Sequence, residues 1–441
     1  MHSIQHEERS ADGTVPAPAA AGPTGTGQPP HEPYLFAQDL LARPAEGYGA
    51  MREQGPVVRG WLTDDQPVWL ITRYDDVRDG LRDGRFVNSP DAIPDHTGDD
   101  PRRMLVDMLN LPEEVQRYFL VSTLDIDPPD HTRLRGAVGR AFSARRMKAL
   151  RPRIERLAGE LLADLQRRSE DGVVEFAEGC AYPLAITVIC ELAGVPEEHR
   201  AVFRRWGDDI LVMDPERLRV SSPAVIGTVH ELLRQRRAEP ADDLLSTLAA
   251  SGADTKFPLT EEEAVAMALN VVMAGYDNTA QLIINSVAAL MTHPDQLRLL
   301  RDRPDLLPGA VNEFVRWCGP DIFVRMRIAA EDVDLHGTPI RKGDAVQFVL
   351  VSANRDPREY TDPDRLDVTR RPHDGSEGHI GFGQGIHYCI GAHLSRLQCE
   401  ITLRALLERH PGLQLAVAPE ELRRTVIPGA APRLGRLPLR L

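Results

Sequence analysis

Gly381–Gly391 reads GFGQGIHYCIG. Glycine occupies every second position at its start, through Gly383 and Gly385, and Cys389 stands before an apolar helical pattern. Glycines permit tight turns with positive φ that direct backbone N–H groups inward, and a helix N-terminus favours an anion such as a thiolate. The stretch lacks the GxGxxG spacing and the Lys-Ser/Thr pair of phosphate-binding loops. It therefore predicts a cysteine thiolate that serves as a metal ligand.

The cysteines narrow the choice of metal. The chain has five of them, widely scattered, with no CxxC pair and no zinc-like spacing with histidine. This pattern argues against a disulfide scaffold and fits a reducing cytosol. A single cysteine without neighbouring ligands also excludes zinc and most iron–sulfur clusters. What remains is a metal whose other ligands come from elsewhere, such as haem iron.

Composition excludes several classes of function. The net charge is −14 and the pI is about 5.5, which argues against a chain-wide electrostatic grip on nucleic acid or anionic lipid. The N-terminus has no signal-peptide pattern, and no run approaches the ~18 to 20 apolar residues of a membrane-spanning helix. We expect a soluble, cytoplasmic protein that binds neither nucleic acid nor membrane. Residues 1–30 are rich in Pro, Gly and Ala and are predicted to be a disordered tail, followed by one catalytic domain over 31–441.

Apolar periodicity predicts a mainly helical domain with small sheets at its margins. Strand-like runs surround Thr63-Asp64-Asp65 as a hairpin and recur over 321–352. The longest helix begins at a capping box formed by Thr260 and Glu263 and continues to His293-Pro294. At about 50 Å it would cross the whole domain. The helical segments are near 131–166, 180–236, 241–251, 260–317 and 389–409, and the longest helix lies within the fourth of them.

At this point the motifs carry a family resemblance. Residues 382–391 resemble the haem-binding signature FGxGxHxCxG of the cytochromes P-450. Glu313-Phe314-Val315-Arg316 resembles the family's ExxR helix, residues 354–365 its meander, and Asp127–Arg135 the start of its C helix. The resemblance spans the chain from about residue 33 to the end. It implies a mainly α, single-domain cytochrome P-450 fold, with helices A to L, small β-sheets and a long I helix over the haem.

The resemblance also implies a cofactor and the residues that hold it. The cofactor would be haem b, with Cys389 as the thiolate ligand and Phe382, Gly383 and Gly391 around it. Two propionates must be neutralised if the haem is buried. The matching basic positions are His131, Arg135, Arg327 and His387. A structural network of Glu313, Arg316 and Arg365 would tie the meander to the ExxR helix.

The middle of the long helix departs from the family pattern. In A/G-G-x-D/E-T-T the first threonine helps to deliver protons, and alignment on Ala274, Gly275 and Asp277 places Asn278 at that position. Thr279 follows, rotated about 100° around the helix. An asparagine amide can hydrogen-bond dioxygen or water but relays protons less readily than a hydroxyl. Asn278 therefore fits a relay completed by water or substrate, an oxidative coupling of aromatic rings, or an ordinary hydroxylase that tolerates it.

Electrons would come from outside the chain, since no flavin or ferredoxin module is fused to it. Residues 131–153 carry seven arginines, one lysine and no acid in an otherwise acidic protein. We expect there a docking patch for an acidic ferredoxin, itself served by a ferredoxin reductase. The patch comprises Arg133, Arg140, Arg145 and Arg146.

The implied function is oxidation of a small-molecule natural product with O₂ and two externally supplied electrons. The chain resembles actinobacterial enzymes that tailor secondary metabolites such as macrolides, peptides and cyclic dipeptides. Hydroxylation is the leading hypothesis. The alternatives are oxidative aryl or indole coupling and a non-catalytic haem-binding protein. Substrate contacts are expected from 87–124, 203–220, 273–278 and 321–325.

Overall fold

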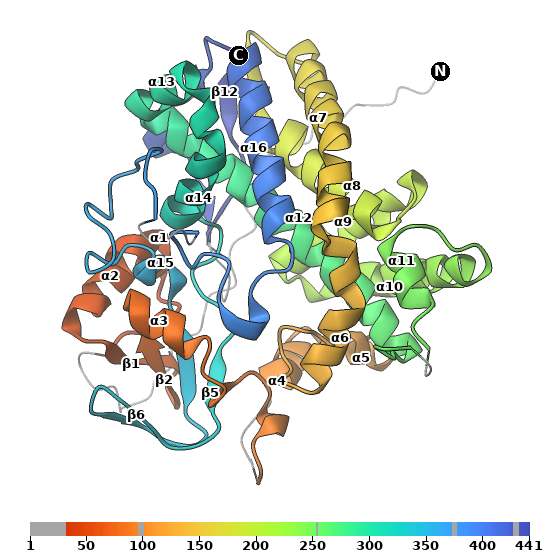
Figure 1. The fold of residues 1–441 in the computed structure, drawn as a ribbon, viewed down its shortest axis with the longest axis vertical. Helices are drawn as coiled ribbons and strands as arrows, with labels where there is room; N and C mark the ends of the chain where they lie inside the picture. The colour runs from red at the N-terminus through yellow and green to blue at the C-terminus, as the bar shows by residue number, and fades with distance from the viewer. Residues whose placement is uncertain (1–31, 96–100, 253–254, 373–376, 427–431) are drawn as a thin grey trace, which may run out of the picture.

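The computed structural model describes residues 32–95, 101–252, 255–372, 377–426 and 432–441. Helices dominate this part of the chain, as the periodicity predicts (Figure 1). The predicted tail over 1–30 lies outside the described residues. The helices are α1 (Gln38–Ala42), α2 (Pro44–Gln54), α3 (Tyr74–Gly80), α4 (Pro101–Met108), α5 (Glu113–Leu120), α6 (Asp130–Gly139), α7 (Ala144–Arg167), α8 (Tyr182–Ala193), α9 (Glu197–Val212), α10 (Pro215–Ala238), α11 (Leu244–Ala249), α12 (Glu261–Thr292), α13 (Pro294–Asp302), α14 (Leu307–Cys318), α15 (Leu350–Ala353) and α16 (Ala392–Arg409).

Helix α12 is the spine of the fold. It has 32 residues and begins at the predicted capping box: the Thr260 hydroxyl accepts from the Glu263 backbone N–H at 3.1 Å, and the Glu263 carboxylate accepts from that of Thr260 at 2.8 Å. Most of its side chains between Ala264 and Leu290 are buried, because α8, α14 and α16 pack around it. A buried polar side chain in this helix therefore needs a hydrogen-bond partner or a functional role.

The strands form small sheets at the margins, also as predicted. The largest has the order β1-β2-β8-β5-β3, in which β1 and β2 are the predicted hairpin. A three-stranded sheet, β4-β12-β9, places the C-terminal strand between two others, and two hairpins, β6-β7 and β10-β11, complete the set. The strands are β1 (Val57–Thr63), β2 (Gln66–Ile71), β3 (Phe86–Val87), β4 (Val173–Glu175), β5 (Arg327–Ala329), β6 (Val333–Leu335), β7 (Thr338–Ile340), β8 (Ala345–Phe348), β9 (Gln414–Leu415), β10 (Arg424–Thr425), β11 (Arg433–Leu434) and β12 (Pro438–Arg440).

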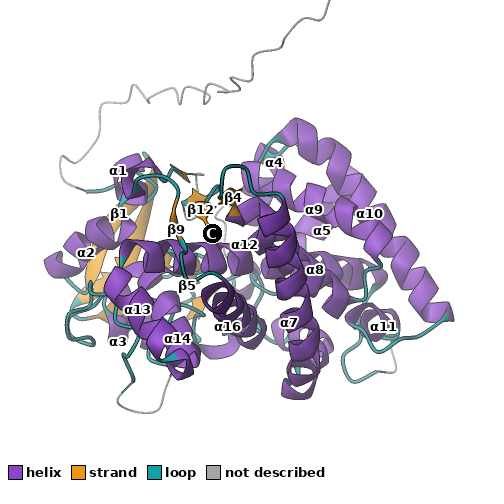
Figure 2. Cartoon of the chain, turned by 90° about the horizontal axis from the view of Figure 1, so that it is seen from above, coloured by secondary structure: helices purple, strands orange, loops and turns teal. Residues whose placement is uncertain are grey.

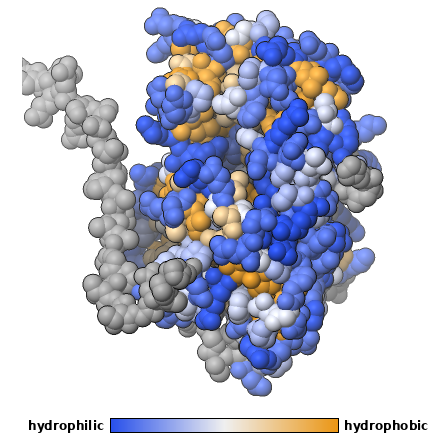
Figure 3. All heavy atoms as spheres, turned by 90° about the vertical axis from the view of Figure 1, so that its left-hand side faces the viewer, coloured by the Kyte–Doolittle hydropathy of each residue, from blue (hydrophilic) through white to orange (hydrophobic). Residues whose placement is uncertain are grey.

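Helices α7 to α11 and the largest sheet lie on different sides of the molecule. Viewed from above, β1 lies beside α1 and α2, while α7 to α11 gather on the other side (Figure 2). The surface is mostly hydrophilic, with apolar patches on the face shown in Figure 3. Among the described residues no single helix meets the length and hydropathy of a membrane span. One bent pair, Ala177–Ala193 with Glu197–Val212, meets them together.

Candidate functional site

The loop before α16 has the tight turns that its glycines predict. Gly383 and Gly385 have φ of +72° and +70°, in the left-handed region that favours glycine. A side chain on Gly385 would also place its Cβ 2.6 Å from the Leu81 carbonyl oxygen. The loop closes on itself where the Cys389 N–H donates to the Phe382 carbonyl at 2.9 Å. Glycine is thus required here by both conformation and space.

Cys389 stands three residues before α16 with its side chain exposed on one side. Crowding by the protein on the other sides raises the pKa of the thiol, and three groups act in the opposite direction: the Gly391 N–H, which hydrogen-bonds the sulfur, and the guanidinium groups of Arg135 and Arg396. Removing a proton from a thiol beside such donors is favoured further by a bound metal cation. The sulfur is therefore accessible from one side, and these three groups would favour its thiolate form when a metal cation binds.

Two side chains pack behind the loop. The Phe382 ring lies under the Arg396 guanidinium, 5.0 Å from its carbon, and 5.6 Å from the ring of His379. His379 is only 2% exposed, and its Nδ1 accepts from the Gly381 N–H at 3.2 Å. Burial, aided by nearby arginines, lowers the pKa of His379 to about 3. Sequence reasoning missed this histidine because its spacing to Cys389 has no motif of its own.

Replacing His379 with asparagine is expected to reduce the loss of stability on acidification. The unfolded chain takes up a proton on His379 below its ordinary pKa of about 6.5, whereas the folded chain does so only near 3, so stability falls as the pH drops through this window. At pH 5 this amounts to about 2 kcal/mol. Urea midpoints at pH 7 and pH 5 measure it. The amide oxygen of asparagine can still accept from Gly381. Equal pH slopes in parent and variant would refute the assignment.

Four basic side chains converge beside the cysteine loop. The His131 and His387 rings are 4.3 Å apart, and burial together with Arg135 and Arg327 lowers the pKa of both histidines, that of His387 to about 3. Burial also lowers the pKa of Arg327 to about 10. Both ring nitrogens of His131 and Nε of Arg327 are buried without a hydrogen-bond partner. Among the described residues none of the four forms an ion pair with a carboxylate.

Buried cations without an anion are costly, so this cluster fits a ligand that supplies negative charge. The two propionates of haem match it in charge and in hydrogen-bonding capacity. Asp127 is nearby, but its carboxylate accepts from the backbone N–H groups of Asn88 and Ser89. The Asn88 side chain in turn contacts His387 Nε2 at 2.8 Å. Asn88 is a residue of the cluster that sequence reasoning did not identify.

One face of α12 is left open by the packing. Asn270, Ala274 and Asn278 recur every fourth residue and are all at least partly exposed, in a helix that is otherwise largely buried. At Gly275 a Cβ would lie 2.5 Å from the Ile189 side chain, so this glycine lets α8 and α12 approach each other. Ala274 and Asn278 therefore lie on the open face of α12.

The remaining polar residues of α12 point elsewhere. Thr279 is 5% exposed and its hydroxyl donates to Ser395 on α16 at 3.4 Å. Asp277 is 3% exposed; one of its oxygens accepts from the Tyr182 hydroxyl at 3.3 Å, and the other lies 2.6 Å from Arg433 Nε. Burial raises the pKa of Asp277, and Arg433 opposes this. The structure thus separates Asn278, on the open face, from Thr279, which faces a neighbouring helix.

The ExxR motif forms the core of a buried network. Arg316 donates to the two oxygens of Glu313 at 2.6 and 2.8 Å. The third member is Arg370, whose Nε lies 3.2 Å from Glu313, and not Arg365 as predicted. Arg365 is exposed and contributes its backbone carbonyl, which accepts from both Arg316 and Arg370. The chain turns between the two positions, so the later arginine reaches the carboxylate.

The basic segment contains two kinds of arginine. Arg133 pairs with Asp130 and Glu263, and Arg146 with Asp242. Arg140 and Arg145 are exposed, and no ion pair of either is present within the described ranges. Among the described residues, the basic segment therefore has fewer unpaired arginines than its composition suggests.

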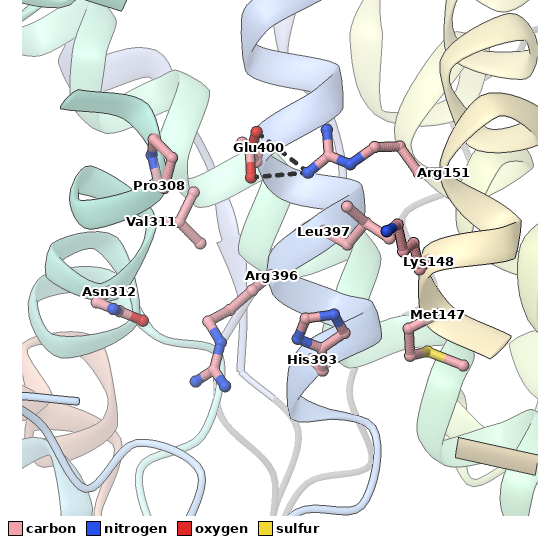
Figure 4. Close-up of a pocket in the computed structure, with 10 residues that line it drawn as sticks. All are labelled: Met147, Lys148, Arg151, Pro308, Val311, Asn312, His393, Arg396, Leu397 and Glu400. Carbon is pink, nitrogen blue, oxygen red and sulfur yellow. Dashed lines mark hydrogen bonds and ion pairs between the residues drawn. The ribbon is translucent and has the colours of Figure 1, made fainter. Parts of the chain in front are cut away.

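A surface pocket of about 280 Å³ is lined by Lys148 and Arg151, which belong to the same basic segment (Figure 4). It lies between α7, α14 and α16, and the Arg151–Glu400 ion pair at 3.3 Å joins α7 and α16 at one end of it. Exposed Lys148 and His393 add basic groups to its rim. Its lining residues are Met147, Lys148, Arg151, Pro308, Val311, Asn312, His393, Arg396, Leu397 and Glu400.

Known proteins are similar to this chain over most of its length. The sequence model of the family described as Cytochrome P450 matches residues 224–411. The chain is 40% identical to 6-deoxyerythronolide B hydroxylase of Saccharopolyspora erythraea over 379 residues, which cover 85% of this chain and 90% of the relative.

Solved structures agree with the sequence matches. The tirandamycin C-bound P450 monooxygenase TamI has a TM-score of 0.80 at 34% identity and covers 93% of this chain and all of its own. The cytochrome P450 enzyme CxnD, for C–S bond formation in chuangxinmycin biosynthesis, has a TM-score of 0.79 at 31% identity, covering 94% and 98%. The predicted fold and the enzyme class are confirmed. The chain belongs to the cytochrome P450 family, whose members are oxidoreductases that bind haem through a cysteine thiolate.

Proposed function

We propose that this chain oxidises a secondary metabolite of polyketide or peptide origin, with Cys389 as the haem ligand and hydroxylation as the reaction. The observation that carries the proposal is the cluster of His131, Arg135, Arg327 and His387 beside Cys389. None of the four pairs with a carboxylate in the part of the chain that the structure describes. The names of the relatives support the substrate class. A hydroxylase of 6-deoxyerythronolide B and a tirandamycin-binding monooxygenase are both similar to this chain over nearly its whole length.

The roles of the residues follow from their positions. Cys389 would hold the iron, and the four basic groups would hold the propionates. When bound, haem supplies the activation of dioxygen with two external electrons. On α12, Ala274 leaves room beside the cofactor because it is small, and Asn278 offers an amide in place of the family's hydroxyl. Asp277, which pairs with Arg433 and accepts from Tyr182, would be the acidic group behind it.

A soluble electron donor would dock near the loop that carries Cys389. Arg140, Arg145 and Lys148 are exposed there, and α16 leads from the pocket of Figure 4 to the cysteine. The partner that fits this basic surface is an acidic ferredoxin, reduced by its reductase. Docking that depends on surface charges weakens with added salt, because ions screen charges more than ~10 Å apart at 0.1 M ionic strength.

Arg145→Glu is expected to raise the KM for an acidic ferredoxin several-fold at low salt, because it reverses a charge at the docking surface. Substrate binding should not change. Arg436→Glu is the matched control, since Arg436 is exposed but belongs to the C-terminal segment. Steady-state kinetics at two ionic strengths separate the two. If both variants raise the KM equally, Arg145 is not part of the docking surface.

The proposal is tested by titrating the haem-loaded protein with macrolactones and cyclic dipeptides and following the spin-state change of the haem. Compounds that bind are then incubated with a surrogate ferredoxin, its reductase and NADPH, and the products are analysed by mass spectrometry. A product heavier by one oxygen atom supports hydroxylation. Binding without turnover, while a related hydroxylase turns over in the same assay, would contradict the proposal and favour a haem-binding protein without catalysis.

A second candidate is oxidative coupling, which Asn278 favours because it lacks the hydroxyl of the usual threonine. The similarity to CxnD, whose name states C–S bond formation, supports the same candidate. Asn278→Thr distinguishes the two reactions. A coupling enzyme should shift from a product lighter by two hydrogens towards hydroxylated product or hydrogen peroxide. A hydroxylase should keep its product and consume less NADPH for each turnover.

A further inference from the structure

Arg433, on strand β11, contacts two successive residues of α12. Its Nη2 donates to Oδ1 of Asn278 at 2.9 Å, and its Nε forms a close ion pair with Asp277 Oδ2 at 2.6 Å. Its Nη1 donates to the carbonyl of Pro320, after α14, at 2.7 Å. The Arg433 side chain is only 12% exposed. One guanidinium thus joins β11, α12 and the segment after α14.

Gln281 fixes the register of this contact. It lies one turn after Asp277, and its amide forms hydrogen bonds in both directions with the backbone of Leu434, at 3.0 and 3.2 Å. The same amide donates to the Tyr182 hydroxyl at 2.8 Å, and Tyr182 donates to Asp277. Because the neighbour of Arg433 is held in this way, the guanidinium has little freedom to leave the two α12 residues.

The contact determines how the Asn278 amide is turned. An amide has one oxygen that accepts and one NH₂ that donates, and its orientation follows from the hydrogen bonds around it. Since the oxygen of Asn278 accepts from Arg433, the NH₂ group is directed away from Arg433. Within the described part of the chain this NH₂ group has no acceptor. Asn278 belongs to the open face of α12, on which Ala274 is exposed.

We propose that Arg433 is a positioning residue for the distal side of the haem: it holds the Asn278 amide with its N–H groups presented to the ligand site and anchors Asp277 behind it. The inference rests on the proposed function, which places the open face of α12 on that side. It gives strand β11 a part in oxygen chemistry, because a displacement of β11 would release both α12 side chains together.

The first test uses the ferrous–CO complex of the haem-loaded protein, since CO reports hydrogen-bond donors at the ligand site without turnover. Infrared spectra of the C–O stretch are recorded for the parent, Arg433→Gln, Arg433→Lys and Asn278→Leu. In Arg433→Gln the Asn278 amide can take either orientation, so the single C–O band should shift or split. Arg433→Lys keeps a cation beside Asp277 and should restore the band in part. Arg436→Gln, at an exposed position of the same segment, should match the parent.

The second test measures how much of the NADPH consumed with a surrogate ferredoxin and reductase ends as hydrogen peroxide. Arg433→Gln should raise that fraction several-fold, and Arg433→Lys should raise it less. Melting temperatures of all variants show whether each is folded. A folded Arg433→Gln with the parent's C–O band and peroxide fraction would overturn the inference and leave Arg433 as a structural contact.

Asn278→Leu keeps the inference testable if the arginine variants fail to fold. It removes the N–H donor at similar volume, so the C–O band should move to a donor-free position. An unchanged band would place Asn278 away from the ligand site and overturn the inference. The outcome is separable from the proposed function: a band that responds as expected, with no oxidation of any metabolite, would contradict the proposed substrate class and support the role of Arg433.

Discussion

Cys389→Ser is expected to abolish the red-shifted ferrous–CO absorption that marks thiolate-ligated haem. A serine hydroxyl is a far poorer anion than a thiol, so the iron would lose its electron-donating ligand. The variant should either bind haem with an ordinary CO spectrum or lose it during purification. The difference spectrum of reduced protein with and without CO, together with haem content, measures both outcomes. Oxidation of any substrate should fall below detection.

The control is Cys399→Ser. Cys399 is fully buried in α16, with its sulfur 3.5 Å from the Ser286 hydroxyl, and burial raises the pKa of its thiol to about 12. It is therefore a neutral packing group, unlike Cys389, whose sulfur is accessible and receives a backbone N–H. Cys399→Ser should keep the thiolate spectrum. The assignment fails if the signature survives Cys389→Ser and is lost in Cys399→Ser.

Features encoded by neighbouring residues were predictable from the sequence. The capping box at Thr260 fixes the start of α12, and the alternating glycines before Cys389 fix the turns that close around it. Each depends on residues a few positions apart, so the pattern carries most of the information. The same holds for the β1-β2 hairpin, whose turn is Asp64-Asp65.

Contacts between distant segments were not predictable. Arg433 reaches Asn278 across 155 residues, and nothing near either position marks the pair. The third member of the ExxR network was assigned to Arg365, yet the path of the chain brings Arg370 to the carboxylate. The prediction identified the kind of group correctly and its position wrongly. The motif indicates that Glu313 needs a second arginine partner. Which of two nearby arginines reaches its carboxylate depends on the tertiary fold.

Glu313→Ala is expected to lower the free energy of unfolding by about 3–5 kcal/mol, the cost of leaving buried charge unpaired. Its carboxylate accepts from Arg316 and from the Asp367 N–H and pairs with Arg370, and both Glu313 and Arg316 have side chains only 1% exposed. We expect low haem content and a reduced urea midpoint in this variant.

Arg370→Ala and Arg365→Ala form a matched pair that tests which arginine completes the network. Arg370→Ala removes a cation from the Glu313 carboxylate and should cost about 1–3 kcal/mol. Arg365 takes part through its backbone carbonyl, which alanine retains, so Arg365→Ala should stay within about 0.5 kcal/mol of the parent. Urea midpoints of the haem-loaded proteins decide between them. A larger loss in Arg365→Ala than in Arg370→Ala would restore the family's expected position and refute the assignment made from the structure.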